Sequence, residues 1–248
     1  EGLKVISKTS TSLSWDWDDV VGADGYKVYR SSDNEELADV SDSEWQQSSL
    51  TPNISSSVYI RAYHGSQLGP RSESVEAYTL ADLPSVLPFS NITQNSITAN
   101  WEAGTNPNGT EYFCENITEG TNSGWITETS WSSTDLESGT QYSFRVKARN
   151  HQNEETDYLD LGSVKTLDIP SAPNMEEPSE INTTSITWQW SPSSGTVTSY
   201  TLYNADNDQP VATGITDTSF KEEGLSSNTS YRRYVKAVGP GGESNKSN

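Results

Sequence analysis

The sequence predicts an all-β chain made of three similar β-sandwiches in tandem, and two recurring marks support this. A tryptophan closes a strand-like run three times at intervals of 84 and 89 residues, at Trp17, Trp101 and Trp190. A leucine follows each of them after 33, 35 and 35 residues, at Leu50, Leu136 and Leu225. Solenoid repeats are shorter, roughly 20 to 50 residues. This period therefore predicts three whole domains, each of about the size of a small sandwich.

Each repeat is expected to contain short strands with one buried face. In the first repeat Leu13, Trp15 and Trp17 share one face, and Tyr26 and Val28 do so on the next strand. Alternation with a period of two is typical of half-buried strands. An aromatic residue five positions before each leucine predicts a third inward-facing strand: Trp45, Trp131 and Phe220. A further strand carries an alanine 12 residues after each leucine: Ala62, Ala148 and Ala237.

Composition favours small cores and a soluble surface. The apolar content is 31% and the mean hydropathy is −0.73, values that are low for one large globule. The formal charge of −20 repels phosphates and anionic lipids, so nucleic acid and membrane surfaces are disfavoured as partners. No apolar run approaches the roughly 20 residues that span a bilayer. No secretion signal opens the chain, which predicts that residue 1 lies inside a longer or processed protein.

The single cysteine, Cys114, excludes an intrachain disulfide and a cysteine-rich zinc site. It occupies the register position of Val28 and Leu202 in the other repeats. A buried small hydrophobe is therefore predicted, in preference to a reactive thiol.

The ordered set of tryptophan, tyrosine, aromatic residue, leucine, tyrosine and alanine resembles a fibronectin type III domain, repeated three times over essentially the whole chain. The segments 17–30 and 144–150 are similar to modules of prokaryotic secreted or cell-surface proteins. The resemblance implies three tandem seven-stranded immunoglobulin-like β-sandwiches. It also implies a tyrosine corner six residues after the leucine, a position held by Tyr142 and Tyr231. The first repeat has Ser56 there, so its corner bond is expected to be absent.

Prolines predict the domain boundaries. Pro84 and Pro173 each lie 17 residues before a repeat tryptophan and mark entry to a first strand. The expected domains are residues 1–81, 82–169 and 170–248. The linkers are short and contain proline, which restricts bending, so an elongated array with end-to-end contacts is expected. Only 58 residues follow Trp190, so the last strand is expected to be incomplete.

Nothing in the sequence predicts catalysis. His64 and His151 fall in equivalent loops about one domain apart, where surface positions are favoured over a catalytic or zinc site. No phosphate-binding glycine loop, nucleophile elbow or zinc-protease motif is present. The prediction is a chain that is not an enzyme, with no catalytic or cofactor-binding residues.

Two acidic clusters leave cation binding as an alternative to solvated charge. Four aspartates crowd the strand end and loop beside Trp17: Asp16, Asp18, Asp19 and Asp24. Oxygen-rich loops can bind calcium, although no EF-hand spacing occurs. A sugar cleft that would make such carboxylates hydrolytic is not expected on a small sandwich. The second cluster, residues 154–160, lies in a loop that by the family's topology faces the preceding domain, where an interdomain ion is the alternative.

Trp125 is the one tryptophan outside the threefold register. Stacking on a sugar ring is one interpretation, since exposed aromatic rings form carbohydrate platforms. The favoured interpretation is an extra strand residue that covers the edge of the core.

The leading functional hypothesis is a non-catalytic spacer, which also presents loops for adhesion, within a larger prokaryotic secreted or cell-surface protein. Its expected partners are other domains of the same parent and a cell-surface protein or polysaccharide. One alternative is a carbohydrate-binding accessory of a polysaccharide-degrading enzyme, with Trp125 as the candidate ligand residue. The other is a filament protomer completed by donor-strand exchange at an unfinished sheet edge, although simple truncation is favoured over it.

Overall fold

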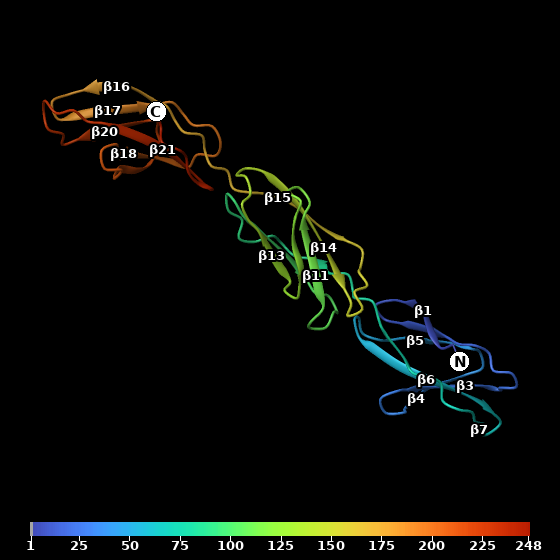
Figure 1. The fold of residues 1–248 in the computed structure, drawn as a ribbon. Coiled ribbons are helices and arrows are strands. Elements are labelled where there is room, and N and C mark those ends of the chain that lie inside the picture. The colour runs from blue at the N-terminus through green and yellow to red at the C-terminus, as the bar shows by residue number, and fades with distance from the viewer. Residues whose placement is uncertain (1) are drawn as a thin grey trace. The chain divides into compact units, whose positions relative to one another are not determined.

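The computed structural model describes residues 2–248, and strands are the only regular elements among them (Figure 1). Contacts group the chain into two units. The first comprises residues 1–88, 99–131 and 143–162, and the second comprises residues 89–98, 132–142 and 163–248. No helix in the described part of the chain is long and apolar enough to cross a membrane.

The first repeat forms two antiparallel sheets. One has the strand order β1-β2-β5, and in the other the order is β4-β3-β6-β7 with β8 also paired to β6. The strands are β1 (Lys4–Lys8), β2 (Leu13–Asp16), β3 (Gly25–Arg30), β4 (Glu36–Val40), β5 (Glu44–Gln47), β6 (Ser55–His64), β7 (Gln67–Leu68) and β8 (Val75–Tyr78). Leu13 and Trp15 are fully buried while their neighbours on β2 are not, as the alternation predicted.

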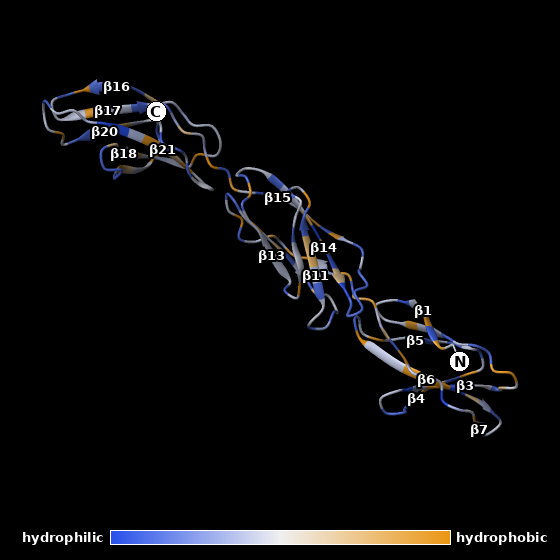
Figure 2. Cartoon of the chain, viewed as in Figure 1, coloured by the Kyte–Doolittle hydropathy of each residue, from blue (hydrophilic) through white to orange (hydrophobic). Residues whose placement is uncertain are grey.

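The second repeat has sheets of order β13-β10-β9 and β12-β11-β14-β15. Its strands are β9 (Ser85–Val86), β10 (Ile97–Glu102), β11 (Glu111–Asn116), β12 (Thr121–Ile126), β13 (Ser130–Ser133), β14 (Gln141–Arg149) and β15 (Leu159–Lys165). Strand β14 alternates without interruption between buried apolar residues and outward residues, the latter including Arg145, Lys147 and Arg149. The strands carry both hydrophobic and hydrophilic residues (Figure 2).

The third repeat has the same arrangement of two sheets, with strand orders β16-β17-β20 and β19-β18-β21-β22. Its strands are β16 (Met175–Ile181), β17 (Ser185–Trp190), β18 (Ser199–Asn204), β19 (Pro210–Ile215), β20 (Ser219–Glu223), β21 (Arg233–Gly239) and β22 (Gly242–Glu243). The final strand is thus two residues long. After it, the amides of Ser244 and Ser247 still donate to the carbonyls of Ala237 and Val235 on β21.

The three recurring tryptophans are core residues, and each packs against the tyrosine that follows it. Ring centroids lie 5.4, 5.9 and 5.6 Å apart for Trp17 and Tyr26, Trp101 and Tyr112, and Trp190 and Tyr200. Edge-on aromatic contacts of this kind stabilise a core beyond the area that they bury. The tryptophan register therefore identifies core positions, as predicted.

The tyrosine corner is present in the two repeats where the sequence predicted it. The hydroxyl oxygens of Tyr142 and Tyr231 accept hydrogen bonds from the amides of Glu137 and Ser226, both at 2.8 Å. In the first repeat the Ser56 hydroxyl donates to Gln47 Oε1 at 2.8 Å instead. Cys114 is fully buried, and burial raises the pKa of its thiol to about 12, so the unreactive thiol form persists at neutral pH.

A buried ion pair in the third repeat escaped the sequence analysis. Arg233 on β21 donates to both carboxylate oxygens of Glu222 on β20, at 3.0 and 2.6 Å. The two side chains are only 5% and 10% exposed. The Trp188 indole N–H also donates to Glu222, at 2.8 Å. In the first repeat, strand register places Val58 and Gln47 at the positions of Arg233 and Glu222.

This substitution pattern gives a testable pair of variants. We expect Arg233→Val alone to lower the free energy of unfolding of the third repeat by about 3 to 5 kcal/mol, because Glu222 stays buried without its partner. The double variant Arg233→Val, Glu222→Gln copies the first repeat and should recover most of that loss. Urea denaturation monitored on the third repeat measures both, and equal losses in the two variants would contradict the assignment.

Candidate functional site

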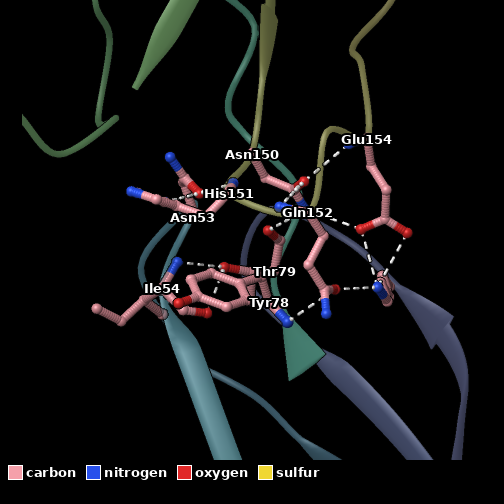
Figure 3. A network of polar contacts seen from close by, with 9 residues as sticks. Asn53, Ile54, Tyr78, Thr79, Asn150, His151, Gln152 and Glu154 are labelled. Atoms are coloured by element: carbon pink, nitrogen blue, oxygen red, sulfur yellow. Dashed lines mark hydrogen bonds and ion pairs between the residues drawn. The ribbon is translucent and has the colours of Figure 1, made fainter. Parts of the chain in front are cut away.

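A network of polar side chains in the first unit joins the end of β1, the turn before β6 and the end of β8 to the loop that follows β14 (Figure 3). We call it the junction network; its members are Lys8, Asn53, Tyr78, Thr79, Asn150, His151, Gln152 and Glu154. It brings together residues of the first and second sequence repeats.

Asn53 is the residue of this network that bonds most directly across the two repeats. It is 3% exposed and has a positive φ of 49°, a conformation that asparagine tolerates better than most residues. Its Oδ1 accepts hydrogen bonds from the backbone N–H of His151 at 2.8 Å and from the ring Nδ1 at 2.7 Å. Its Nδ2 donates to Thr110 Oγ1 at 2.9 Å. The carboxamide therefore connects the turn that precedes β6 to two separate loops of the second repeat.

Asn150 shapes the loop and attaches it at the same time. Its Oδ1 accepts from the amides of Gln152 and Glu154 at 3.0 and 2.9 Å, the kind of local bond by which asparagine fixes a turn. Its Nδ2 donates to the Thr79 carbonyl at 3.0 Å, on the segment that follows β8. Because Asn150 is only 2% exposed, loss of these partners would leave buried polar atoms unsatisfied.

The outer part of the network is ionic. Lys8 on β1 donates to both carboxylate oxygens of Glu154 at 2.9 and 2.8 Å and to Gln152 Oε1 at 2.8 Å. Burial acts to raise the pKa of Glu154, but the hydrogen bonds from Lys8 and Asn150 outweigh it and hold that pKa below its ordinary value. The His151 ring stacks on Tyr78 with centroids 5.4 Å apart.

The segment that leads into the second repeat is also anchored to it. The Asp82 amide donates to Asn106 Oδ1 at 2.7 Å, and Asn106 Nδ2 donates back to the Asp82 carbonyl at 2.8 Å. The Thr105 hydroxyl donates to Asp82 Oδ2 at 2.7 Å. Both ends of the segment 79–82 therefore form hydrogen bonds with loops of the second repeat, Thr79 with Asn150 and Asp82 with Asn106.

The sequence located this loop but missed its bonds. The cluster at 154–160 was expected to face the preceding repeat, with an interdomain ion as one interpretation. Glu154 does face it, but its carboxylate contacts the Lys8 ammonium. His151 was expected at the surface of the loop, and its bonds to Asn53 were not predicted. The one sequence signal for these bonds was the asparagine three residues after Leu50. The equivalent positions of the other two repeats, Gly139 and Asn228, also have a positive φ.

The four calcium candidates are not gathered around one point. Asp16 pairs with Lys4 at 3.0 Å. Asp24 Oδ2 accepts from the Gly65 amide at 2.6 Å, and this bond, helped by the nearby His64, lowers the pKa of Asp24. Asp18 lies against the backbone of Gly2, and Asp19 lines a neighbouring surface hollow. Within residues 2–248 no three acidic, histidine or cysteine residues have an arrangement that could hold a metal ion.

Trp125 is a residue of β12, the edge strand of its sheet, and lies on the face opposite to the buried residues of β11. It pairs in register with Phe113, whose ring centroid is 5.4 Å away. The Arg149 guanidinium carbon lies 4.3 Å from the Trp125 ring centroid. The Lys147 ammonium lies 5.5 Å from the same ring and 4.8 Å from the Tyr158 ring. The strip therefore alternates aromatic rings and cations, which attract each other.

The first prediction for this site concerns Asn53. We expect Asn53→Gly to preserve the positive φ, as Gly139 does in the second repeat, while removing the carboxamide. The His151 amide should then exchange with solvent at least tenfold faster, because its acceptor is lost. Hydrogen exchange followed by NMR measures this. Asn228→Gly, the exposed equivalent in the third repeat, is the matched control and should leave His151 unchanged; a protected His151 amide in Asn53→Gly would contradict the assignment.

The second prediction concerns pH. Because the folded-state pKa of Glu154 is lowered, its ionic contribution is complete above its ordinary value of 4.5 and is lost as the pH falls through the lower folded value. Below about pH 4.5 the Tyr78 amide and the Lys8 side-chain NMR signals should therefore shift together. Glu154→Gln should abolish this shift, and a shift that persists in that variant would assign it to another group.

Comparison with known proteins gives consistent matches. A model of the fibronectin type III domain matches residues 82–159 and 171–248, more than half of the chain. Chitinase A1 of Niallia circulans is 30% identical over 169 residues, which cover 64% of this chain and 24% of that protein. The chain thus spans about a quarter of the length of this relative.

A solved structure of two tandem domains shows the same fold. A segment of two fibronectin type III domains from chicken tenascin aligns with a TM-score of 0.51 at 22% identity, covering 67% of this chain and 98% of that one. The FN1–FN3 domains of chicken CNTN1 align over all of this chain and 96% of that one, with a TM-score of 0.38 and 17% identity.

Proposed function

Since the chain belongs to the fibronectin type III family, we propose that it is a non-catalytic spacer that also presents loops for adhesion. In this proposal it is a segment of a larger prokaryotic protein that is secreted or displayed at the cell surface. Residues 1–81 form a third domain beside the two that the family model matches. Its partners are the other domains of its parent protein and a cell-surface protein or polysaccharide.

The junction network carries the proposal. A spacer must resist bending between its modules, and buried hydrogen bonds across a junction supply that resistance because bending would leave them unsatisfied. Asn53 and Asn150 are both buried, and each bonds across the two repeats. The short segment 79–82 between the repeats is bonded on both sides, which leaves little free linker.

The pairing of charged side chains with opposite charges also favours a structural role. On the outer face of β14, Arg145 pairs with Glu115, Lys147 with Glu155 and Arg149 with Glu111. Side chains that neutralise one another in this way are not poised for acid–base or nucleophilic chemistry. The net charge of −20 supports solubility of the segment. The match to a bacterial chitinase, of which it covers only 24%, supports a larger prokaryotic parent protein.

Small-angle X-ray scattering tests the spacer role. We expect an elongated particle with a narrow distribution of maximum dimensions. The double variant Asn53→Gly, Asn150→Ala should broaden that distribution by freeing the junction, while the control Asn228→Gly should not. A particle as short as a single globule of this mass would contradict the proposal.

The strip of aromatic rings and cations favours a second candidate, a carbohydrate-binding accessory. Phe113, Trp125 and Tyr158 lie on one sheet face, and the bacterial relative's name is that of a chitin-degrading enzyme. The contacts of Trp125 with Phe113 and Arg149 argue against this candidate, because they leave less of the ring surface to stack on a sugar. Retention on chitin beads that Trp125→Ala abolishes would favour this candidate, and absence of retention favours the spacer.

A further inference from the structure

A tight turn in the second repeat, Pro107 to Thr110, ends at a residue that is bonded to the junction network. The Thr110 amide donates to the Pro107 carbonyl at 3.2 Å, and Gly109 has a φ of 91°. A positive φ at the third residue of a four-residue turn is typical of a type II turn and favours glycine there. The turn therefore places Asn108 directly before a glycine at its outer corner.

The backbone nitrogen of Gly109 is accessible to the Asn108 side chain and to water. Asn108 is the one asparagine in the sequence that is followed by glycine, and both residues are exposed. Apart from the chain neighbours of Gly109, no heavy atom of the described residues lies within 4 Å of the place where its Cβ would stand. Because glycine has no side chain, nothing crowds its nitrogen against attack on the carboxamide of the preceding residue.

Other exposed asparagines differ from Asn108 in both respects. Asn207 is followed by aspartate, and its Oδ1 accepts a hydrogen bond from the Gln209 amide at 3.1 Å. Asn122 is followed by serine, and its Oδ1 accepts from the Gly124 amide at 3.0 Å. These bonds hold the carboxamide in place, and the side chain of the next residue hinders its backbone nitrogen. Asn108 is thus the asparagine best placed to react with its own backbone.

The inner end of the turn is buried and contacts Asn53. Thr110 is 1% exposed, and its hydroxyl donates to the Pro107 carbonyl at 2.9 Å while it accepts from Asn53 Nδ2 at 2.9 Å. A change in the length of the backbone between Pro107 and Thr110 would therefore displace this hydroxyl from Asn53. Because Asn53 is also buried, a lost partner leaves one of its N–H groups unsatisfied.

We propose that Asn108 is a site of spontaneous covalent modification that loosens the junction network. The Gly109 nitrogen forms a bond to Asn108 Cγ, the bond from Cγ to Nδ2 breaks, and ammonia leaves with the proton of the Gly109 amide. The product is a cyclic imide, a succinimide. Water then opens either of its two carbonyl groups, which gives aspartate or isoaspartate. Water is the only co-reactant, and no electrons are transferred to or from the chain.

The two products act differently on the turn. Aspartate keeps the backbone and adds a negative charge at the exposed corner. Isoaspartate routes the main chain through the side-chain carbons, so the backbone between residues 108 and 109 gains one carbon atom. This longer turn no longer holds the Thr110 hydroxyl at Asn53, and the junction loses a buried hydrogen bond. The inference goes beyond the proposed spacer function and does not rest on it.

The test incubates the full chain in warm, mildly alkaline buffer and follows it by peptide mapping with mass spectrometry. Labelling with an isoaspartyl methyltransferase distinguishes isoaspartate from aspartate. We expect modification at Asn108 to be about tenfold faster than at Asn207, because glycine leaves the attacking nitrogen uncrowded. The NMR signals of the Asn53 carboxamide should shift in proportion to the isoaspartate formed.

Two variants separate the chemistry from its effect on the junction. Asn108→Gln has a longer side chain, which closes a larger ring more slowly, so its Asn53 signals should stay unchanged through the same incubation. Freshly prepared Asn108→Asp carries the added charge without the extra backbone carbon. It should therefore leave the Asn53 signals where they are in the unmodified chain.

Three results would overturn the proposal. An Asn108 that is modified no faster than Asn207 would show that the turn does not permit the reaction. Isoaspartate at residue 108 with unchanged Asn53 signals would show that the turn and the junction are not coupled. A shift of the Asn53 signals in fresh Asn108→Asp, equal to that in the incubated chain, would assign the effect to charge instead of backbone length.

Discussion

Two buried carboxamides impose the main constraint on the first unit of this protein. Asn53 and Asn150 have little access to water, and each bonds to the other's repeat. An unsatisfied buried amide costs about 1 to 3 kcal/mol, so separation of the two loops is opposed by both residues at once. Lys8 and Glu154 add an ionic contact at the solvent side, where screening makes its contribution small. The constraint is therefore mainly one of desolvated hydrogen bonds.

The same requirement, that buried polar groups be hydrogen-bonded, explains the contacts at the ends of the first and second repeats. A hydroxyl group can donate and accept at once, so a single threonine satisfies two backbone groups of the loop that it covers. Thr79 and Thr166 do this, and Thr79 also places its carbonyl where Asn150 binds it. The closure of the first repeat and its attachment to the second thus share one residue. A change at Thr79 would affect the core edge and the junction together.

The sequence predicted the parts of this structure that depend on periodic burial. Trp17, Trp101 and Trp190 are core residues, and Tyr142 and Tyr231 form corner bonds, because these roles follow from spacing along one strand or one loop. It missed the Arg233–Glu222 pair and the Asn53 bonds. Those depend on which residues face each other from separate strands or repeats, and charge or polarity at a single position does not reveal a partner far along the chain.

The account is tested most directly by the relative orientation of the first two repeats in solution. Residual dipolar couplings measured on the unmodified chain give an alignment tensor for residues 2–81 and another for residues 99–162. If Asn53 and Asn150 hold these parts together, the two sets of couplings will fit a single tensor. Two tensors of different magnitude would show independent motion and would contradict the account.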